Sequence, residues 1–167
     1  NMGEIIAVKK NIKKKQTSNN GINCALVIGR KGSKGLPGKI MYPVLGRPIS
    51  WYSINAARKS KFVDRIFVST DSEKLKKLAK QQKVEIIDRP RKLATDKALG
   101  DHVFVHGYYE IKKIVEKEKK KINTMILLFA NAPTITGNLI DRGIKILNKN
   151  KFFDSAVTTS VYNMWSP

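Results

Sequence analysis

A loop rich in glycine and basic residues follows the first strongly apolar segment of the chain. Residues 24–28 are continuously apolar, and residues 29–39 read GRKGSKGLPGK. Its four glycines allow the backbone to bring N–H groups close to a ligand, and four cations stand among them. Amide donors and cations at the end of a strand are the groups that bind a polyphosphate. The loop therefore predicts a polyphosphate site.

The loop matches neither of the two common phosphate-binding signatures. Lys39 is followed by Ile40 rather than by Ser or Thr, and Ser33 stands where a Walker A loop begins with Gly. The spacing of the glycines also departs from the dinucleotide-binding fingerprint. A flexible basic surface loop would have the same composition, so only the order of the residues distinguishes the two interpretations.

Short apolar runs alternate with amphipathic segments around this loop and indicate an α/β domain. Strands are expected at residues 24–28, 65–69, 84–87, 125–129 and 155–160. Helices are expected between them, beginning near Ser50, Ser72, Leu99 and Thr136, with the three hydroxyl side chains as caps. Strand and helix in alternation predict a Rossmann-like, mostly parallel sheet with helices on both faces.

The loops after the strands are the expected binding site, because open α/β sheets bind ligands beyond the carboxyl ends of their strands. These loops are residues 29–39, 69–72, 88–97 and 129–134. Asp71 is a candidate metal ligand, although capping of the next helix explains it about equally well. Asp96 can likewise order its own loop.

The composition sets limits on partners and location. The 167 residues carry a formal charge of +20, and 26 of the 33 basic residues are lysine. Direct nucleic-acid readout favours arginine, so nucleic acid is not expected as the main partner. No apolar run approaches the roughly 20 residues of a membrane helix. Cys24 is the only cysteine, which excludes an internal disulfide and predicts a cytoplasmic protein. Residues 1–22 are expected to form a basic tail, and residues 23–167 the folded domain.

The order of the loop residues resembles the signature of the acylneuraminate cytidylyltransferases, A-R-G-G-S-K-G-(I/L)-P-x-K-N. The residues in register are Arg30, Gly32, Ser33, Lys34, Gly35, Leu36, Pro37 and Lys39. Three later segments continue the resemblance. Residues 64–71 end in S-T-D, residues 89–96 are similar to the R-P-x-x-L-A-(S/T)-D loop, and residues 127–133 partly fit L-L-Q-P-T-S-P.

This resemblance implies a nucleotide-diphospho-sugar transferase fold and the reaction of CTP with a sialic-type sugar acid to give CMP-sugar and pyrophosphate. It implies Mg²⁺ or Mn²⁺ as cofactor and a homodimer for the full-length protein. Arg30 and Lys39 match catalytic positions. The implied ligands of the CTP phosphates are Arg30, Gly32, Ser33, Lys34, Gly35 and Lys39, and those of the nucleoside are Arg89 and Asp96.

The sequence departs from the family pattern at several positions, and the resemblance implies that some of them contribute to recognising the base or the sugar. The departures are Lys31 for Gly, Ile40 for Asn, Gly100 for Ser, Phe129 for Gln, and Asn131-Ala132 for Thr-Ser. Selectivity for cytosine is therefore open, and a related protein with altered or lost nucleotide selectivity is the alternative. A basic nucleic-acid-binding module is the third hypothesis. The sequence also ends before the family's dimerisation arm and D-x-D segment, so residues 1–167 alone are expected to release little pyrophosphate.

Overall fold

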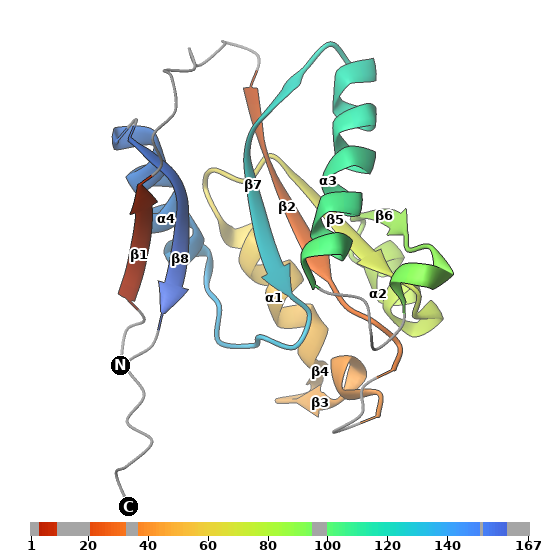
Figure 1. Ribbon diagram of the computed structural model, residues 1–167. Coiled ribbons are helices and arrows are strands. Elements are labelled where there is room, and N and C mark those ends of the chain that lie inside the picture. Colours follow the sequence, from red (N-terminus) through yellow and green to blue (C-terminus); the bar gives the residue numbers. More distant parts are fainter. Residues whose placement is uncertain (1–3, 10–20, 33–36, 95–99, 151, 160–167) are drawn as a thin grey trace, which may run out of the picture.

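The computed structural model describes residues 4–9, 21–32, 37–94, 100–150 and 152–159 (Figure 1). Its strands are β1 (Glu4–Lys9), β2 (Gly21–Ile28), β3 (Pro43–Val44), β4 (Arg47–Pro48), β5 (Arg65–Thr70), β6 (Glu85–Asp88), β7 (Lys121–Phe129) and β8 (Phe153–Thr159). Its helices are α1 (Ile49–Lys59), α2 (Glu73–Gln81), α3 (Gly100–Lys117) and α4 (Gly137–Lys149), with short 3-10 turns η1 (Lys39–Met41) and η2 (Arg91–Leu93). None of these described helices combines the length and apolar character needed to cross a bilayer.

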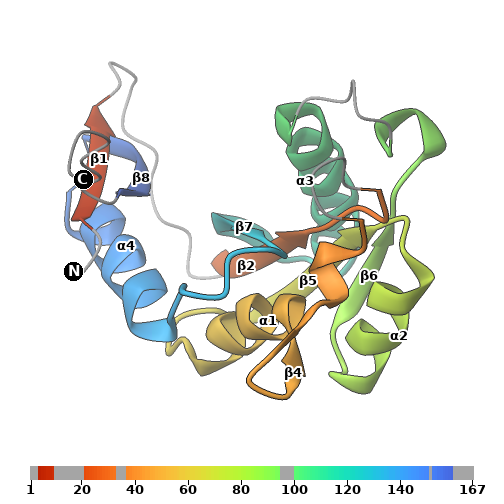
Figure 2. The same cartoon turned by 90° about the horizontal axis from the view of Figure 1, so that it is seen from below.

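A four-stranded parallel sheet in the order β6-β5-β2-β7 forms the centre of the fold. The central strand β2 is apolar because both of its faces are covered. Ala25 and Val27 pack in the core formed with α1, α2 and α4, whereas Leu26 packs in the core formed with α3. Figure 2 shows α3 on one side of the sheet and α1 and α2 on the other. The predicted parallel sheet with helices on both faces is confirmed.

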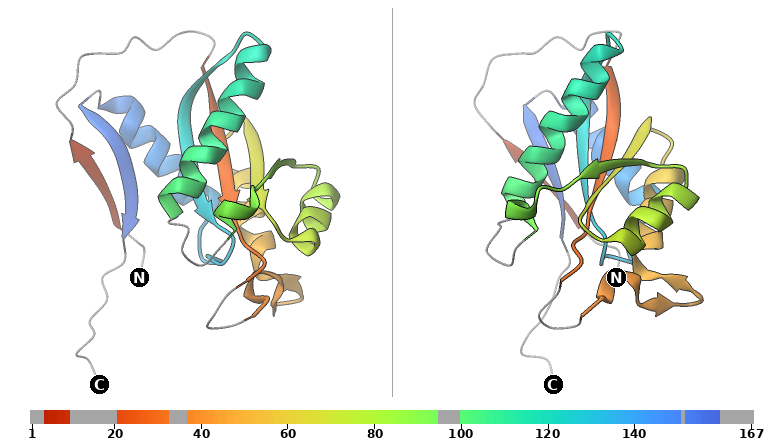
Figure 3. Two further views of the ribbon diagram at one scale, coloured as in Figure 1. Left: turned by 45° about the vertical axis from the view of Figure 1, so that its right-hand side comes forward. Right: turned by 90° about the vertical axis from the view of Figure 1, so that its right-hand side faces the viewer.

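The close approach of α3 to the sheet depends on Gly107. A Cβ atom at this position would lie 2.4 Å from Cδ2 of Leu26. The same packing buries Cys24 and raises the pKa of its thiol to about 11, so the thiol stays neutral at physiological pH. Figure 3 shows α3 lying along the length of the sheet.

The order of the strands creates a switch point between β2 and β7. The chain leaves β2 for β5 and β6 on one side, and α3 then returns it to β7 on the other side. The carboxyl ends of β2 and β7 lie next to each other, with Ile28 opposite Phe129. A crevice is expected at such a reversal, and it is the usual place for a ligand in an open α/β sheet.

The strand expected at residues 155–160 does not join the central sheet. Instead β8 pairs antiparallel with β1, in a separate two-stranded sheet that contacts α4 (Figure 2). The residues of β8 are mostly exposed, which suits a sheet with one open face rather than a strand buried on both. Because β1 is a strand, the expectation of a tail at residues 1–22 does not hold for Glu4–Lys9.

Two of the three expected helix caps are confirmed. The hydroxyls of Ser72 and Thr136 accept hydrogen bonds from the amides of Leu75 and Leu139. Ser50 is not a cap, because α1 begins one residue earlier and the Ser50 side chain is buried against the sulfur of Met41. Pro48 is the N-cap of α1 and makes no side-chain cap hydrogen bond; the amide of Ile49 donates to the Tyr42 carbonyl at 2.8 Å instead.

Candidate active site at the carboxyl edge of the sheet

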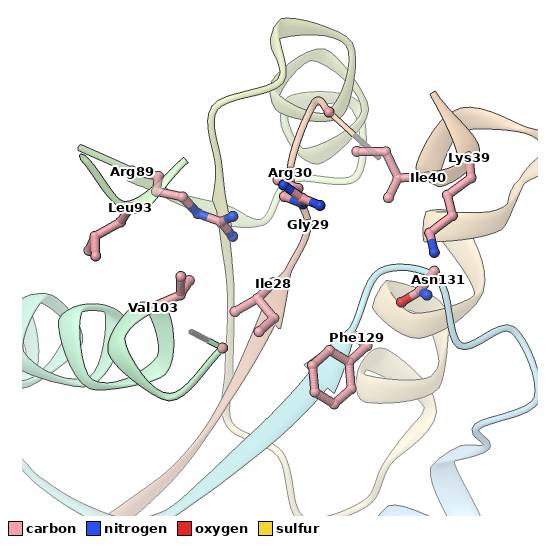
Figure 4. A pocket seen from close by; sticks show the side chains of 12 residues that line it. Ile28, Gly29, Arg30, Lys39, Ile40, Arg89, Leu93, Val103, Phe129 and Asn131 are labelled. Atoms are coloured by element: carbon pink, nitrogen blue, oxygen red, sulfur yellow. The ribbon is translucent and has the colours of Figure 1, made fainter. Parts of the chain in front are cut away.

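A pocket of about 230 Å³ opens at the switch point between β2 and β7 (Figure 4). Three of the four predicted loops contribute to its walls. The lining residues are Ile28, Gly29, Arg30, Gly32, Lys39, Ile40, Arg89, Leu93, Gly100, Val103, Phe129 and Asn131. The fourth loop, which contains Asp71, does not line the pocket, but it accepts a hydrogen bond from the glycine-rich loop.

The glycine-rich loop is fixed to β5 at two points. The Gly29 amide donates a hydrogen bond to the Ser69 carbonyl at 3.2 Å, and the Lys31 amide donates to Oδ1 of Asp71 at 2.8 Å. Gly29 itself is wedged into the core, since a Cβ there would lie 2.7 Å from Cβ of Ala130. The start of the loop is therefore held in place before any ligand arrives.

The end of the loop turns back toward the pocket at Gly38. Its φ of 72° lies in the left-handed region, which glycine adopts without strain, and it begins η1. This turn places Lys39 on the pocket wall beside the buried Ile40. In Figure 4 the Lys39 ammonium points toward Asn131 and the interior of the pocket.

Arg89 is a buried cation with an unused donor at the pocket wall. Its residue surface is only 9% exposed, and Nη2 donates a hydrogen bond to the Ser69 carbonyl at 2.8 Å. Nε has no partner among the described residues. Burial lowers the pKa of the guanidinium, an effect that Arg30 reinforces and Asp71 opposes, although arginine remains protonated at any physiological pH. A buried, charged, unsatisfied donor favours binding of a ligand oxygen.

The structure thus brings three of the predicted site residues, Arg30, Lys39 and Arg89, to one pocket from two separate loops. Gly32 also lines this pocket. Ser33, Lys34, Gly35 and Asp96 lie outside the described residues. The concentration of positive charge suits an anionic ligand, and the apolar walls beside Arg89 suit a flat apolar one.

The sequence model of a family described as Cytidylyltransferase matches residues 24–162. The chain belongs to the cytidylyltransferase family. It is 38% identical over 83 residues to the N-acylneuraminate cytidylyltransferase of Escherichia coli O18:K1:H7, an alignment that covers 50% of this chain and 20% of that protein. It is 26% identical over 137 residues to the pseudaminic acid cytidylyltransferase of Campylobacter jejuni serotype O:23/36, covering 80% of this chain and 57% of that one.

Solved structures of the cytidylyltransferase family have the same fold. A cytidylyltransferase from Leptospira borgpetersenii superposes with a TM-score of 0.61 at 22% identity, over 78% of this chain and 50% of that one. A CMP-2-keto-3-deoxy-manno-octonic acid synthetase complexed with CTP gives a TM-score of 0.61 at 17% identity, over 78% and 48%. The fold is therefore of the nucleotide-diphospho-sugar transferase type. The chain spans about half the length of these relatives, and less of the Escherichia coli protein.

The described part of this cytidylyltransferase-family chain holds no ready-made cluster of metal-ligating side chains. Among the described residues, no three His, Cys, Asp or Glu side chains stand close enough to share an ion. Asp71, the candidate ligand, does not line the pocket, and its Oδ1 accepts the Lys31 amide. Its role as a helix cap is also not found, because Ser72 performs it. Asp71 instead holds the glycine-rich loop.

The apolar walls of the pocket were missed by sequence reasoning. Leu93 and Val103 face Arg89 across one end, and Phe129 lies at the other. Phe129 and Asn131 lie in the predicted loop 129–134, but their roles as wall residues were not predicted, although both differ from the family pattern. Ser53 was also missed: its buried hydroxyl donates to the Phe129 carbonyl at 2.7 Å and fixes the turn after β7.

The hydrogen bond that the Asp71 carboxylate accepts from the Lys31 amide, called the clamp below, can be tested without a ligand. Asp71→Ala should speed hydrogen exchange of the Lys31 amide roughly tenfold or more, because it removes a hydrogen bond to a charged acceptor worth about 1.5 kcal/mol or more. Asp71→Asn keeps an acceptor oxygen and should retain most of the protection. NMR-detected exchange measures both. Equal exchange rates in the parent and in Asp71→Ala would show that the clamp does not form in solution.

Proposed function

We propose that this protein is a cytidylyltransferase that joins CTP and a sialic-type sugar acid, giving CMP-sugar and pyrophosphate. The proposal rests above all on the pocket at the switch point, where Arg30, Lys39 and the buried Arg89 converge. Family membership supports the cytidylyl group as the transferred unit. The similarity to N-acylneuraminate and pseudaminic acid cytidylyltransferases supports an acidic sugar as its acceptor.

The chemistry requires positioning and positive charge more than a strong base. The anomeric hydroxyl of the sugar attacks the α-phosphorus of CTP and loses its proton, while the bond from that phosphorus to the pyrophosphate oxygen breaks. Negative charge grows on the leaving pyrophosphate. Arg30 and Lys39, on opposite ends of the glycine-rich loop, are the side chains we assign to this charge.

Arg89 is assigned to the nucleoside end of the same ligand. Its guanidinium and the nearby Leu93 and Val103 form a largely apolar slot with a charged group at its wall. A pyrimidine base has flat apolar faces and a carbonyl oxygen at its edge, and it matches such a slot. No step depends on a divalent cation held by the described residues. Mg²⁺ or Mn²⁺ enters this proposal only as an ion that accompanies the triphosphate.

A panel of nucleoside triphosphates tests the proposal directly. Thermal unfolding is measured with CTP, UTP, ATP or GTP in the presence of Mg²⁺. CTP at a hundred times its dissociation constant should stabilise the protein by about 2.7 kcal/mol. Equal stabilisation by all four would support a protein without cytosine selectivity. No stabilisation, combined with tight and salt-sensitive oligonucleotide binding, would support the nucleic-acid hypothesis instead.

Arg30→Ala and Lys39→Ala should each weaken CTP binding by about 1.5 kcal/mol, roughly tenfold, the lower end for hydrogen bonds to charged groups. Both side chains are only partly buried, so solvent screening limits the effect. Titration calorimetry with CTP measures it. Lys117→Ala is the matched control. The substitution removes the same positive charge, but from an exposed residue at the far end of α3, so CTP affinity should not change. Parent-like CTP affinity in both loop variants would contradict the assignment of the loop.

A further inference from the structure

Two buried polar atoms beside the pocket have no hydrogen-bond partner among the described residues. They are the hydroxyl oxygen of Ser69 and Nε of Arg89. Ser69 is fully buried, and Arg89 is only 9% exposed. A buried donor or acceptor that forms no hydrogen bond is unfavourable, so native proteins pair such groups or place a water between them. The Ser69 carbonyl already binds Gly29 and Arg89, whereas the hydroxyl of the same residue has no assigned role.

The side chain of Ser69 lies on the face of the sheet that α3 covers. Side chains alternate along a strand, and Phe67, two residues earlier, packs in the core formed with α3. Ser69 pairs with Ile28 of β2 and Ile87 of β6, and both of these residues belong to the same core. Arg89 follows Ile87 by two positions, and its Nη2 donates to the Ser69 carbonyl at 2.8 Å. The Arg89 guanidinium is therefore anchored to the residue whose hydroxyl has no partner.

The planar shape of the guanidinium directs Nε to this residue as well. The N–H of Nε and one N–H of Nη2 point from the same edge of the group. Because Nη2 is bonded to Ser69, Nε faces Ser69 too. Arginine offers only donors, whereas a serine hydroxyl can also accept. One water that accepts from Nε–H and donates to Oγ satisfies both buried atoms, as buried waters commonly do.

A second anchor matters because Arg89 stands close to another cation. Burial lowers the pKa of Arg89 most, and Arg30 lowers it further, so the two positive charges are near enough to repel each other. With Nη2 alone bonded, the guanidinium can turn about that single hydrogen bond. A bond at Nε fixes the plane of the group, and Nη1 is then the donor that remains for a ligand oxygen.

We propose that Ser69 is a positioning residue for Arg89, and that its hydroxyl holds Nε through one buried water and so directs Nη1 into the pocket. This inference rests on the proposed function, in which Arg89 binds the nucleoside end of CTP. It adds to that site a residue that contacts neither substrate. The Ser69 hydroxyl sets the orientation of the guanidinium, and the fold does not depend on it.

A double-mutant cycle on the full-length protein tests this coupling, with CTP affinity measured by titration calorimetry. Ser69→Ala should weaken CTP binding roughly three- to tenfold, the contribution of about one hydrogen bond. In the Arg89→Ala background the same substitution should change nothing further, because the group that it positions is gone. Ser69→Cys keeps a side chain of similar size but is a poor acceptor, so it should lose affinity like Ser69→Ala.

A second measurement needs no CTP. The Arg89 Nε proton, followed by NMR, should exchange with solvent roughly three- to tenfold faster in Ser69→Ala than in the parent. Ser60→Ala is the matched control. It removes another buried serine hydroxyl, which donates to Oδ1 of Asp141 at 2.5 Å and does not line the pocket. It should lower the unfolding temperature and leave both CTP affinity and Nε exchange unchanged.

Parent-like CTP affinity in Ser69→Ala or Ser69→Cys would overturn the proposal, as would an equal loss of affinity with and without Arg89. Unchanged Nε exchange in Ser69→Ala would overturn it too. A parent that binds no CTP would contradict the proposed function, whereas the exchange rates would still show whether Ser69 anchors the Arg89 side chain.

Discussion

Arg89→Ala should weaken CTP binding by about 3 kcal/mol, more than a hundredfold in the dissociation constant, and leave the fold intact. The effect is expected to exceed that of the loop cations because Arg89 is nine-tenths buried, where solvent screens its charge least. The fold should survive because the Ser69 carbonyl, which loses the Arg89 donor, still accepts the Gly29 amide. Titration calorimetry measures the affinity, and circular dichroism checks the fold.

Two variants make this result specific. Arg89→Lys keeps the positive charge but loses the planar fork, so it should recover only part of the affinity. Arg91→Ala removes the same charge from an exposed residue two positions along the chain and should bind CTP like the parent. Unfolding of Arg89→Ala would mean that the guanidinium is mainly structural, and unchanged CTP affinity would remove it from the site.

Gly29→Ala should lower the free energy of unfolding by about 1–3 kcal/mol, the usual cost of overpacking, and should also impair CTP binding. The added Cβ would lie 2.7 Å from Cβ of Ala130 and 2.8 Å from Cδ2 of Leu75. Ala130 cannot rotate away, so the loop has to move and Arg30 moves with it. Urea unfolding and CTP titration on the same variant measure the two effects.

A second substitution tests whether the contact with Ala130 causes these effects of Gly29→Ala. Adding Ala130→Gly to Gly29→Ala removes the nearest contact atom and should restore part of the lost CTP affinity. Gly32→Ala is the control for stability, because a Cβ there meets no atom within 4 Å. If Gly29→Ala unfolds at the same urea concentration as the parent, the loop is not wedged against β7 as described.

The central sheet could be predicted because its strands are covered on both faces and therefore read as apolar runs. The strand β7 was predicted only from residue 125, since its first residues, from Lys121, alternate between exposed and partly buried side chains. The pairing of β8 with β1 could not be predicted. It joins segments about 150 residues apart, and no local pattern specifies a partner at that distance.

The charged residues of the candidate site could be predicted from the sequence, but the apolar residues that line the pocket could not. Arg30, Lys39 and Arg89 stand in recognisable motifs after strands, whereas Val103, on a helix, has the same appearance as a core residue in the sequence. Asp71 illustrates a second limit. Its position after a strand fits a cap, a metal ligand or a clamp, and only the structure shows the Lys31 amide, 40 residues away, as its partner.

Strand β5 contributes no side chain to the pocket, yet its end holds both the glycine-rich loop and Arg89 in position. The Ser69 carbonyl accepts one hydrogen bond from the glycine-rich loop and one from Arg89, and Asp71, directly after the strand, accepts another from the loop. The position of the glycine-rich loop relative to Arg89 is therefore set by the end of a single strand. Under the proposed function CDP lacks the terminal phosphate and its contacts with the loop cations, so it should bind more weakly than CTP.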